Sequence, residues 1–584
     1  MSEPLPIIEP VADFALRLCF EPMPARSTDA TVPTEPEILP SAARTATLRQ
    51  ALLSLRREPP EGLTDVIAGY RSLLLRFDPA RFAPDVAAAW LRQRLHSVAA
   101  TPPEPPRQIE LPVWYGGEHG PDLEDLARHA GLSVAEVIAL HAGARYTVAF
   151  LGFAPGFPYL LGLPPALHMP RLPSPRLQVP AGSVAIAGGQ AGIYPQRSPG
   201  GWRLLGRTTT ALVRFSPSPW TLLLPGDVLR FVPQTGSPPA EPAAAAMASV
   251  DPEPPVALHV LSPGPLTTVQ DLGRPGHAHL GISAGGAADP IALRLANRLL
   301  GNPDGAAALE LTLRGPQLRA ECDLRLAVVG SLDLHIDGVA VPSGQTLHLR
   351  RGQILGCGSL REGVRGYLAV AGGLSLPLLA GSAATDLRAG FGGLLGRGLR
   401  SGDRLAVGAG DPAAGANDRV PHVLTAQGQA LLRPRSTLRV MWGGQAAGFD
   451  PALRERLSQV PLRVRAQANR TGLRLQAEPP LSALGGAGPS AQLLSEGVSV
   501  GTVQVPPDGQ PILLAVEQQV TGGYPQLAQV IAADWPLLGR LRPGDVVFLQ
   551  PVSLSEAQAA YRHLWAQLSA AVAPRPDVPS QPVS

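Results

Sequence analysis

Hydrophobic and polar residues alternate through much of the second half of the chain, which is typical of strands with one buried face. Residues 332–336 alternate strictly, Asp337-Gly338 is a common hairpin dipeptide, and residues 347–350 alternate again. Helices are signalled less often. Residues 289–301 combine an acidic N-cap, a proline in the first turn and a closing glycine, and Ser133 forms a capping box with Glu136. The pattern predicts a mainly β protein with α+β elements.

Several short motifs of the first half recur in the same order in the second half. Residues 179–180, 192–195, 202–207 and 225–227 are matched by residues 505–506, 522–525, 535–540 and 543–545. The shared elements are Val-Pro, Tyr-Pro after glycine, a tryptophan before Leu-Leu-Gly-Arg, and Pro-Gly-Asp. We therefore predict two related β-rich domains, each with a Pro-Gly-Asp turn before its final strand.

Segments rich in proline and alanine divide the 584 residues, which are enough for several globular units. Residues 233–255 lack any apolar periodicity and read as a linker between two halves. A weaker break at residues 101–107 divides the first half, and a polar stretch at 21–43 reads as a surface insertion. From residue 571 on, the chain has the composition of a disordered tail.

Charge and residue usage exclude several functions. The 49 basic residues are balanced by 46 acidic ones, so we expect no nucleic-acid partner. All basic residues are arginine, because the sequence contains no lysine. This chain therefore has no Walker A lysine, no Schiff base for pyridoxal phosphate and no attachment point for biotin, and another polypeptide would have to supply them.

The cysteines and the apolar segments indicate a cytoplasmic protein. Cys19, Cys322 and Cys357 form no CxxC pair and read as reduced thiols. Residues 1–10 lack the basic start of a signal peptide. The longest uncharged stretch, 366–385, is broken by glycines and a proline, so we expect no membrane span.

One serine motif and one histidine motif each allow a functional and a purely structural interpretation. Gly281–Gly285 matches GxSxG, but no apolar strand precedes it and the next helix begins only after residue 289. We expect a glycine-rich loop that binds an anion or amide in front of that helix, or a plain turn. His277 and His279 could ligate a metal from one strand face, but no third ligand accompanies them. We assign no metal site and expect two exposed loop histidines.

Two further segments concentrate binding groups. Residues 194–202 combine a guanidinium, a hydroxyl, free backbone amides and an aromatic face, which suits a small carboxylate, amide or phosphate, although a structural turn is the alternative. Residues 517–525 place a carboxylate and two amides directly after the apolar strand 512–516. Polar clustering at the end of a buried strand favours a functional site.

Longer motifs resemble the B and C subunits of bacterial 5-oxoprolinase. The first half is similar to the B subunit, the kinase-inhibitor protein, in residues 112–123, 152–160, 179–187 and 198–202. The second half is similar to the C subunit, the kinase-inhibitor antagonist, in residues 264–274, 296–302, 309–310, 366–373, 505–511 and 521–525. The chain thus resembles a fusion of the two, and the same modules form the carboxyltransferase part of urea amidolyases.

The resemblance implies a domain plan. It is a small N-terminal α/β domain (1–100), a cyclophilin-like β domain (101–232), the linker (233–255), a β-rich domain (256–430), a second cyclophilin-like β domain (431–555) and a tail (556–584). The implied activity is hydrolysis of 5-oxo-L-proline to L-glutamate, driven by ATP with Mg²⁺ and shared with a separate TIM-barrel-like A subunit. Phosphorylation of the lactam oxygen would give the unstrained amide a leaving group. A homo-oligomer stays open.

We predict two groups of site residues. One pocket is lined by Arg197, Ser198 and Gly200. The other contains Gln270, Asp271, Arg274, Asn297, Glu310, Gln504, Glu517, Thr521, Gly523 and Tyr524. Arg197, Arg207, Arg274 and Arg470 are candidates for phosphate binding, Glu310, Glu517 and Asp271 for catalysis, and Gln270 and Asn297 for the lactam.

The chain departs from the family pattern at several positions. Ala384 stands where a hydroxyl is usual, Val520 where a second threonine is usual, Glu517 where aspartate is usual, and residues 277–279 differ as well. Two other functions therefore stay open. One is the carboxyltransferase of a biotin-dependent urea carboxylase system, and the other is a regulator that binds a kinase, which a permanent fusion of inhibitor and antagonist disfavours.

Overall fold

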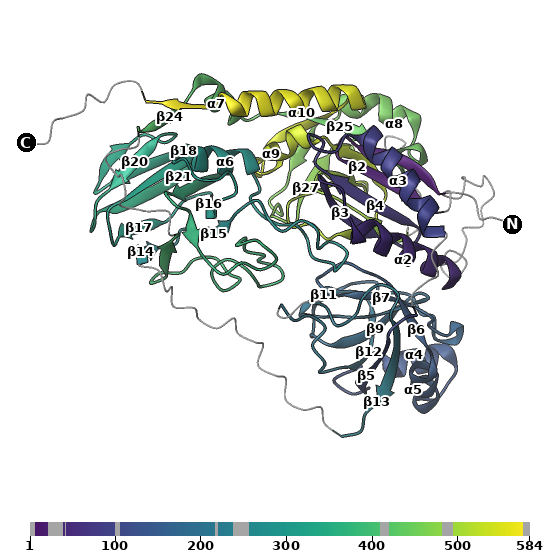
Figure 1. Cartoon of the computed structure of the whole chain (residues 1–584). Coiled ribbons are helices and arrows are strands. Elements are labelled where there is room, and N and C mark those ends of the chain that lie inside the picture. Colours follow the sequence, from purple (N-terminus) through teal and green to yellow (C-terminus); the bar gives the residue numbers. More distant parts are fainter. Residues whose placement is uncertain are drawn as a thin grey trace, which may run out of the picture.

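The computed structural model describes residues 6–20, 39–40, 42–99, 105–215, 220–236, 256–408, 420–481 and 494–575 (Figure 1). Most of the predicted linker and surface insertion, and the end of the predicted tail, lie outside the described residues. None of the helices in these ranges combines the length and apolar composition needed to span a bilayer.

A four-stranded antiparallel sheet of order β1-β2-β4-β3 begins the chain. Its elements are β1 (Ile7–Ala12), β2 (Ala15–Cys19), α2 (Ala42–Arg57), β3 (Leu63–Ala68), β4 (Ser72–Phe77) and α3 (Pro84–Ala99). Every residue of β4 is buried because both faces of the sheet are covered. Leu73 and Leu75 pack under the helices, and Leu74 packs with Val520 and Ala532 of the second half. Figure 1 shows this sheet, in purple, beside the green and yellow C-terminal barrel.

The next unit is a closed barrel of seven strands, with a two-stranded arm. The barrel strands are β5 (Gln108–Tyr115), β6 (Tyr146–Leu151), β7 (Pro158–Leu161), β9 (Ser183–Ala187), β10 (Gln190–Ile193), β12 (Arg203–Arg207) and β13 (Val228–Pro233). The arm consists of β8 (Arg176–Val179) and β11 (Ser198–Gly200), and the helices are α4 (Leu123–Ala130) and α5 (Val134–Gly143). The capping box predicted at Ser133 and Glu136 is confirmed.

A ten-stranded sheet opens the second half. It contains β14 (Val256–Ser262), β15 (Leu266–Gln270), β16 (Ala308–Thr312), β17 (Gln317–Ala320), β18 (Leu324–Ile336), β19 (Val339–Val341), β20 (Thr346–Leu349), β21 (Ile354–Val370), β22 (Leu374–Ser375) and β23 (Arg404–Val407), with helix α6 (Pro290–Arg298). The predicted hairpin is confirmed: Asp337 and Gly338 both have positive φ, 49° and 83°, as a type I′ turn requires.

A second closed barrel of seven strands completes the fold. Its strands are β25 (Thr437–Trp442), β26 (Leu462–Val464), β27 (Gly472–Ala477), β29 (Thr502–Gln504), β30 (Ile512–Leu514), β32 (Gln526–Val530) and β33 (Val546–Pro551). The pair β28 (Glu496–Gly497) and β31 (Thr521–Gly522) lies outside it. Helix α7 (Ala426–Leu431) precedes the barrel, and α8 (Pro451–Arg456) and α9 (Trp535–Leu538) pack on its core.

The two barrels have the same topology. We number the strands of each barrel in the order in which they occur along the chain. Neighbouring strands around both barrels then follow the order first, sixth, fourth, fifth, third, second and seventh. In both, the first and last strands pair in parallel, as β5 with β13 and β25 with β33. The recurring motifs of the sequence thus correspond to two copies of one barrel, and the β-rich fold predicted from them is confirmed.

The prediction of a tail at residues 556–584 is wrong up to residue 575, because this part of the chain forms a helix and a strand. Helix α10 (Leu554–Ser569) begins with a capping box at Ser553 and Glu556, and β34 (Val572–Pro574) pairs with β24 (His422–Leu424). Figure 1 shows α10 running along one edge of the molecule. Its Leu568 packs with α6, so the segment is held by contacts that its local composition does not signal.

Candidate functional site

Arg470 lies at the centre of a buried ion network between the ten-stranded sheet and the second barrel. Its Nε donates to Glu517 Oε1 at 2.6 Å and its Nη1 to Glu310 Oε1 at 2.5 Å. Its Nη2 donates to the Gly286 carbonyl at 2.6 Å. The arginine therefore ties β16, the loop before α6 and the turn after β30 together, as a planar fork of donors can.

Glu310 has both oxygens occupied. Oε2 accepts from the Ala288 amide at 2.9 Å and from the Tyr367 hydroxyl at 2.6 Å, while Oε1 accepts from Arg365 and Arg470. Burial alone would raise the pKa of Glu310, but the two arginines hold it below its usual value. Glu310 is thus ionised and holds neighbouring segments together. The catalytic role predicted for it would need a free carboxylate oxygen, and both oxygens already accept hydrogen bonds.

Glu517 differs from Glu310 in having an unused oxygen. Only its Oε1 accepts a hydrogen bond from the described residues. Burial raises its pKa, and the nearby negative charges of Asp386 and Glu310 act in the same direction, against the opposing effect of Arg470. A carboxyl with a raised pKa and a free oxygen is suited to proton transfer.

Three charged side chains interact electrostatically with Glu517, and a tyrosine is linked to them through one of the three. The electrostatic influence of Glu517 reaches Arg274 and Arg388, and both arginines also interact with Asp386. Arg388 interacts with Tyr159 of β7 as well. We call Tyr159, Arg274, Asp386, Arg388 and Glu517 the interdomain cluster. It draws on the first barrel, the ten-stranded sheet domain and the second barrel.

Glycines and one aspartate shape the loop that carries Asp386 and Arg388. Asp271 accepts hydrogen bonds from the Ser382 hydroxyl at 2.7 Å and the Ala383 amide at 2.6 Å, which fixes the start of the loop. Gly393 has φ +51°, and a Cβ there would lie 1.9 Å from Thr385 Oγ1. Asp271, predicted to be catalytic, therefore acts as a loop anchor.

The first barrel is docked directly onto this region. The Gly156 amide donates to the Leu280 carbonyl at 2.9 Å, and Gly152 lies against Thr521 of β31. The GxSxG loop therefore forms part of the contact between the two halves. The anion site expected in front of α6 is not available, because Asp289 caps that helix itself, accepting from the Ile291 and Ala292 amides.

Gly152→Ala is expected to disturb this contact, since a Cβ would lie 2.0 Å from Thr521 Oγ1. We expect a loss of about 1–3 kcal/mol in stability, typical of overpacking, and partial recovery in the double variant with Thr521→Gly. Thermal unfolding of the wild type and the variants measures both. A melting temperature unchanged in Gly152→Ala would contradict the tight contact.

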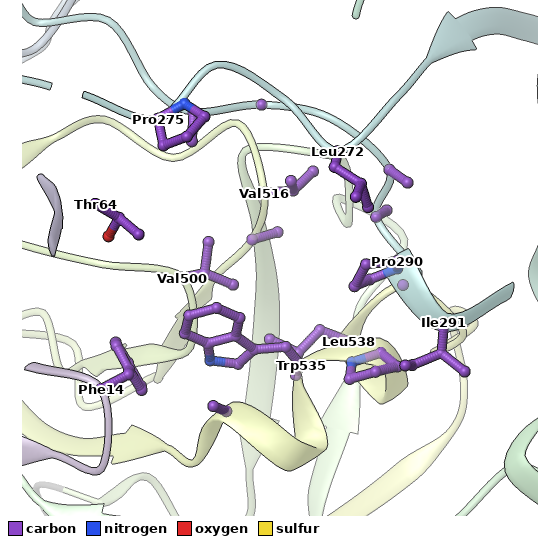
Figure 2. A pocket seen from close by; sticks show the side chains of 18 of the residues that line it. Phe14, Thr64, Leu272, Pro275, Pro290, Ile291, Val500, Val516, Trp535 and Leu538 are labelled. Atoms are coloured by element: carbon purple, nitrogen blue, oxygen red, sulfur yellow. The ribbon is translucent and has the colours of Figure 1, made fainter. Parts of the chain in front are cut away.

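An apolar cavity of about 310 Å³ has Arg470 and Gly285 in its wall. In Figure 2, Phe14 and Thr64 approach from one side, Leu272, Pro290 and Ile291 from the opposite side, and the Trp535 indole extends between them. Its wall is mostly hydrocarbon and aromatic. A small polar amide is therefore better matched by the interdomain cluster than by this cavity.

Comparisons with known proteins agree with this two-half architecture. The model of carboxyltransferase subdomains A and B matches residues 280–551, and that of subdomains C and D matches residues 23–223. The chain is 38% identical to the C subunit of 5-oxoprolinase from Escherichia coli (strain K12) over 304 residues, 52% of this chain and 94% of that protein. The chain belongs to the carboxyltransferase-domain family of the 5-oxoprolinase subunits.

Other relatives cover the remaining parts of the chain. The first half is 56% identical to the B subunit of 5-oxoprolinase from Escherichia coli O157:H7 over 128 residues, 22% of this chain and 59% of that protein. Urea amidolyase of Saccharomyces cerevisiae is 29% identical over 318 residues, 52% of this chain and 17% of that protein. The crystal structure of TTHA0988 matches with a TM-score of 0.75 at 38% identity, over 88% of this chain and 97% of that one. The B-like and C-like halves meet at the interdomain cluster.

The structure also shows where the other predicted site residues lie. Thr521 and Gln504 are buried near the cluster, with Gln504 Nε2 beside Gly522. Gln270 donates to the Thr385 carbonyl at 3.1 Å, next to Asp386. Gly523 and Tyr524 follow β31, with Tyr524 45% exposed.

Asn297 is used for another purpose. Its Nδ2 donates to the Asp304 and Ala306 carbonyls, so it holds the loop after α6 instead of facing the cluster. Arg207 donates to the Ala181 carbonyl at 2.7 Å.

The pocket predicted around Arg197 is only partly formed. Arg197 is exposed and reaches Gln178 at 3.4 Å, Ser198 is buried in the arm, and Gly200 packs on Tyr194. Its neighbour Gln196 donates to the Arg388 carbonyl at 3.3 Å, so this segment borders the interdomain cluster.

Tyr159, Asp386 and Arg388 were missed by reasoning from the sequence. Asp386 and Arg388 lie in an Asp-Leu-Arg-Ala-Gly-Phe-Gly-Gly loop that reads as a surface turn. An arginine amid glycines, shortly after Ala384, where the chain departs from the family pattern, was the signal that could have found them.

The histidine motif also needs a correction. His277 and His279 were expected to be exposed, but His277 stacks on Trp220 at 4.8 Å and His279 is buried. Burial lowers the pKa of His279 to about 3, so it stays neutral. No group of three or more His, Cys, Asp or Glu side chains suited to a metal occurs within the described ranges.

Proposed function

We propose that this chain supplies the B and C components of an ATP-dependent 5-oxoprolinase that hydrolyses 5-oxo-L-proline to L-glutamate with a separate TIM-barrel-like A subunit. The observation that carries the proposal is the interdomain cluster, in which a carboxyl of raised pKa and two arginines meet where the B-like and C-like halves join. The 5-oxoprolinase subunits among its relatives support the same substrate.

The chemistry required is the opening of an unstrained lactam. Transfer of the γ-phosphoryl group of ATP to the lactam oxygen releases ADP and makes the ring carbon electrophilic. One water then adds to that carbon, the ring nitrogen leaves as an amine, and γ-glutamyl phosphate forms. A second water releases phosphate and leaves glutamate. In this proposal Glu517 accepts a proton from the attacking water or returns one to the departing nitrogen.

The carboxyl and guanidinium groups of the interdomain cluster suit magnesium-bound ATP, although the chain has no lysine. Mg²⁺ is commonly held by one or two carboxylates together with the phosphates, and Asp386 is the carboxylate of the cluster that would hold it, which leaves Glu517 for proton transfer. Arg274 and Arg388 supply guanidinium donors for phosphate oxygens or a substrate carboxylate.

A carboxyltransferase is the second candidate, because both matching family models describe carboxyltransferase subdomains. In that reaction a carboxyl group passes from carboxybiotin to an amide nitrogen. The biotin would have to be carried by another protein, since the sequence offers no lysine.

The deciding experiment measures release of glutamate and ADP from 5-oxo-L-proline and MgATP. It uses this chain alone, the A subunit alone and the mixture. We expect stoichiometric release of both products only in the mixture. No release from a mixture shown to associate, together with carboxyl transfer from carboxybiotin to urea, would replace the proposal with the second candidate.

A further inference from the structure

Arg388 has a guanidinium that the fold positions but does not use. Its guanidinium carbon lies over the ring of Phe153 from the first barrel, 5.1 Å from the ring centroid. Its backbone carbonyl is fixed by Gln196 at 3.3 Å. Across the described residues, no hydrogen bond or ion pair involves the guanidinium nitrogens.

Arg274 presents a second set of unused donors nearby. It is 1% exposed and stacks over Phe391 at 4.7 Å. Its Nε and Nη2 donate to the Leu379 and Ala384 carbonyls, whereas its Nη1 has no partner within the described part of the chain. A buried N–H without a partner is costly, so the free Nη1 marks a place where a ligand or water accepts a hydrogen bond.

Both arginines border the same two carboxyl groups. Arg274 and Arg388 each interact with Asp386 and with Glu517. A ligand that reaches both guanidinium groups is therefore within electrostatic range of Glu517. Stacked, planar guanidinium groups with free N–H donors are preorganised for a carboxylate, which accepts two parallel hydrogen bonds.

We propose that Arg388, assisted by Nη1 of Arg274, binds the α-carboxylate of the lactam substrate and so selects carboxylated lactams over plain ones. The inference rests on the proposed function and names the part of the substrate that this site recognises. It assigns Arg388 to substrate selection and leaves proton transfer to Glu517. The lactam ring is then held next to the carboxyl group that handles its protons.

Two lactams test this assignment, because 2-pyrrolidinone is 5-oxoproline without the carboxylate. Each is titrated calorimetrically into the mixture of this chain and the A subunit, and into the A subunit alone. The wild-type mixture is expected to bind 5-oxo-L-proline about 10 to 100 times more tightly than 2-pyrrolidinone, as hydrogen bonds to a charged group allow. In Arg388→Ala this preference should disappear, and Arg388→Lys should keep part of it.

Arg128→Ala is the matched control, since Arg128 is exposed on α4 and pairs only with Asp125 among the described residues. It should leave the preference unchanged. The inference is overturned if the wild type shows no preference, if Arg388→Ala keeps it, or if Arg388→Ala weakens both lactams equally while its melting temperature falls.

Turnover measured in the same mixtures separates this inference from the proposed function. Glutamate release that is unaffected by Arg388→Ala overturns the carboxylate assignment and leaves the 5-oxoprolinase proposal standing. A preference that depends on Arg388, in a wild-type mixture that releases no glutamate, overturns the 5-oxoprolinase proposal and supports the carboxylate site.

Discussion

Arg470→Met is expected to destabilise the second half by about 3–5 kcal/mol, the typical cost of removing one partner from a buried ion pair. The variant leaves Glu517 without its cation, removes one of two arginines from Glu310, and leaves the Gly286 carbonyl unpaired. Methionine fills most of the volume, so the loss reports on charge and hydrogen bonding. Urea unfolding followed by circular dichroism measures it.

Arg474→Met is the control for this prediction. Arg474 lies on the same strand region, on β27, but is exposed, and its replacement should cost less than about 0.5 kcal/mol. In a double-mutant cycle with Glu517→Gln, the cost of Arg470→Met should become smaller, because no uncompensated carboxylate remains at that position. Equal unfolding midpoints for Arg470→Met and Arg474→Met would show that the network contributes nothing.

The parts of the fold that could be predicted were those encoded locally. Ser133 with Glu136, and Asp337 with Gly338, each specify a cap or a turn within a few residues, and both are found. The recurring motifs predicted two related domains because turns such as Pro-Gly-Asp occupy equivalent places in both barrels. Helix α10 and the docking of the N-terminal sheet depend on contacts between distant segments, such as Phe14 with Trp535 at 4.4 Å. Such contacts leave no periodic signal.

The candidate site was predictable to the extent that polar residues follow buried strands. Glu517, Arg470 and Arg274 were identified in this way or by resemblance, and they do come together. The separate roles of the two glutamates could not be predicted, because they depend on the hydrogen bonds and charges that the fold brings to each carboxyl. Asn297 shows the converse, since a buried polar residue near a site can serve only its own loop. Arg388 was missed because its aromatic partner belongs to the other half.

Glu517→Gln is expected to lower kcat for lactam hydrolysis about 10²- to 10⁴-fold, the usual contribution of a general acid or base. Its free oxygen and raised pKa distinguish it from Glu310, which should be replaceable only at the expense of stability. Glu517→Asp should keep part of the activity, because a carboxylate remains. Glu455→Gln, on the exposed face of α8, is the control and should retain full activity. Product release by the assembled enzyme is the measurement, and a Gln variant with wild-type kcat would remove Glu517 from the mechanism.

The pH dependence provides a second, independent check on Glu517. Because burial raises its pKa in the folded state, the rise of kcat with pH should occur above the usual range of a glutamate, and the Gln variant should lack that rise.

The raised pKa of Glu517 also affects the stability of the protein. The folded protein binds this proton more tightly than the unfolded chain does. The stabilisation is therefore complete below the pKa of Glu517 in the unfolded chain and is lost as pH rises through its pKa in the folded protein. The stability of the wild type relative to Glu517→Gln should therefore fall as pH rises through and above the usual titration range of a glutamate, as urea midpoints measured across a series of pH values would show. A parallel pH dependence of the two proteins would mean that Glu517 titrates like an exposed carboxyl and is not held in the state that proton transfer requires.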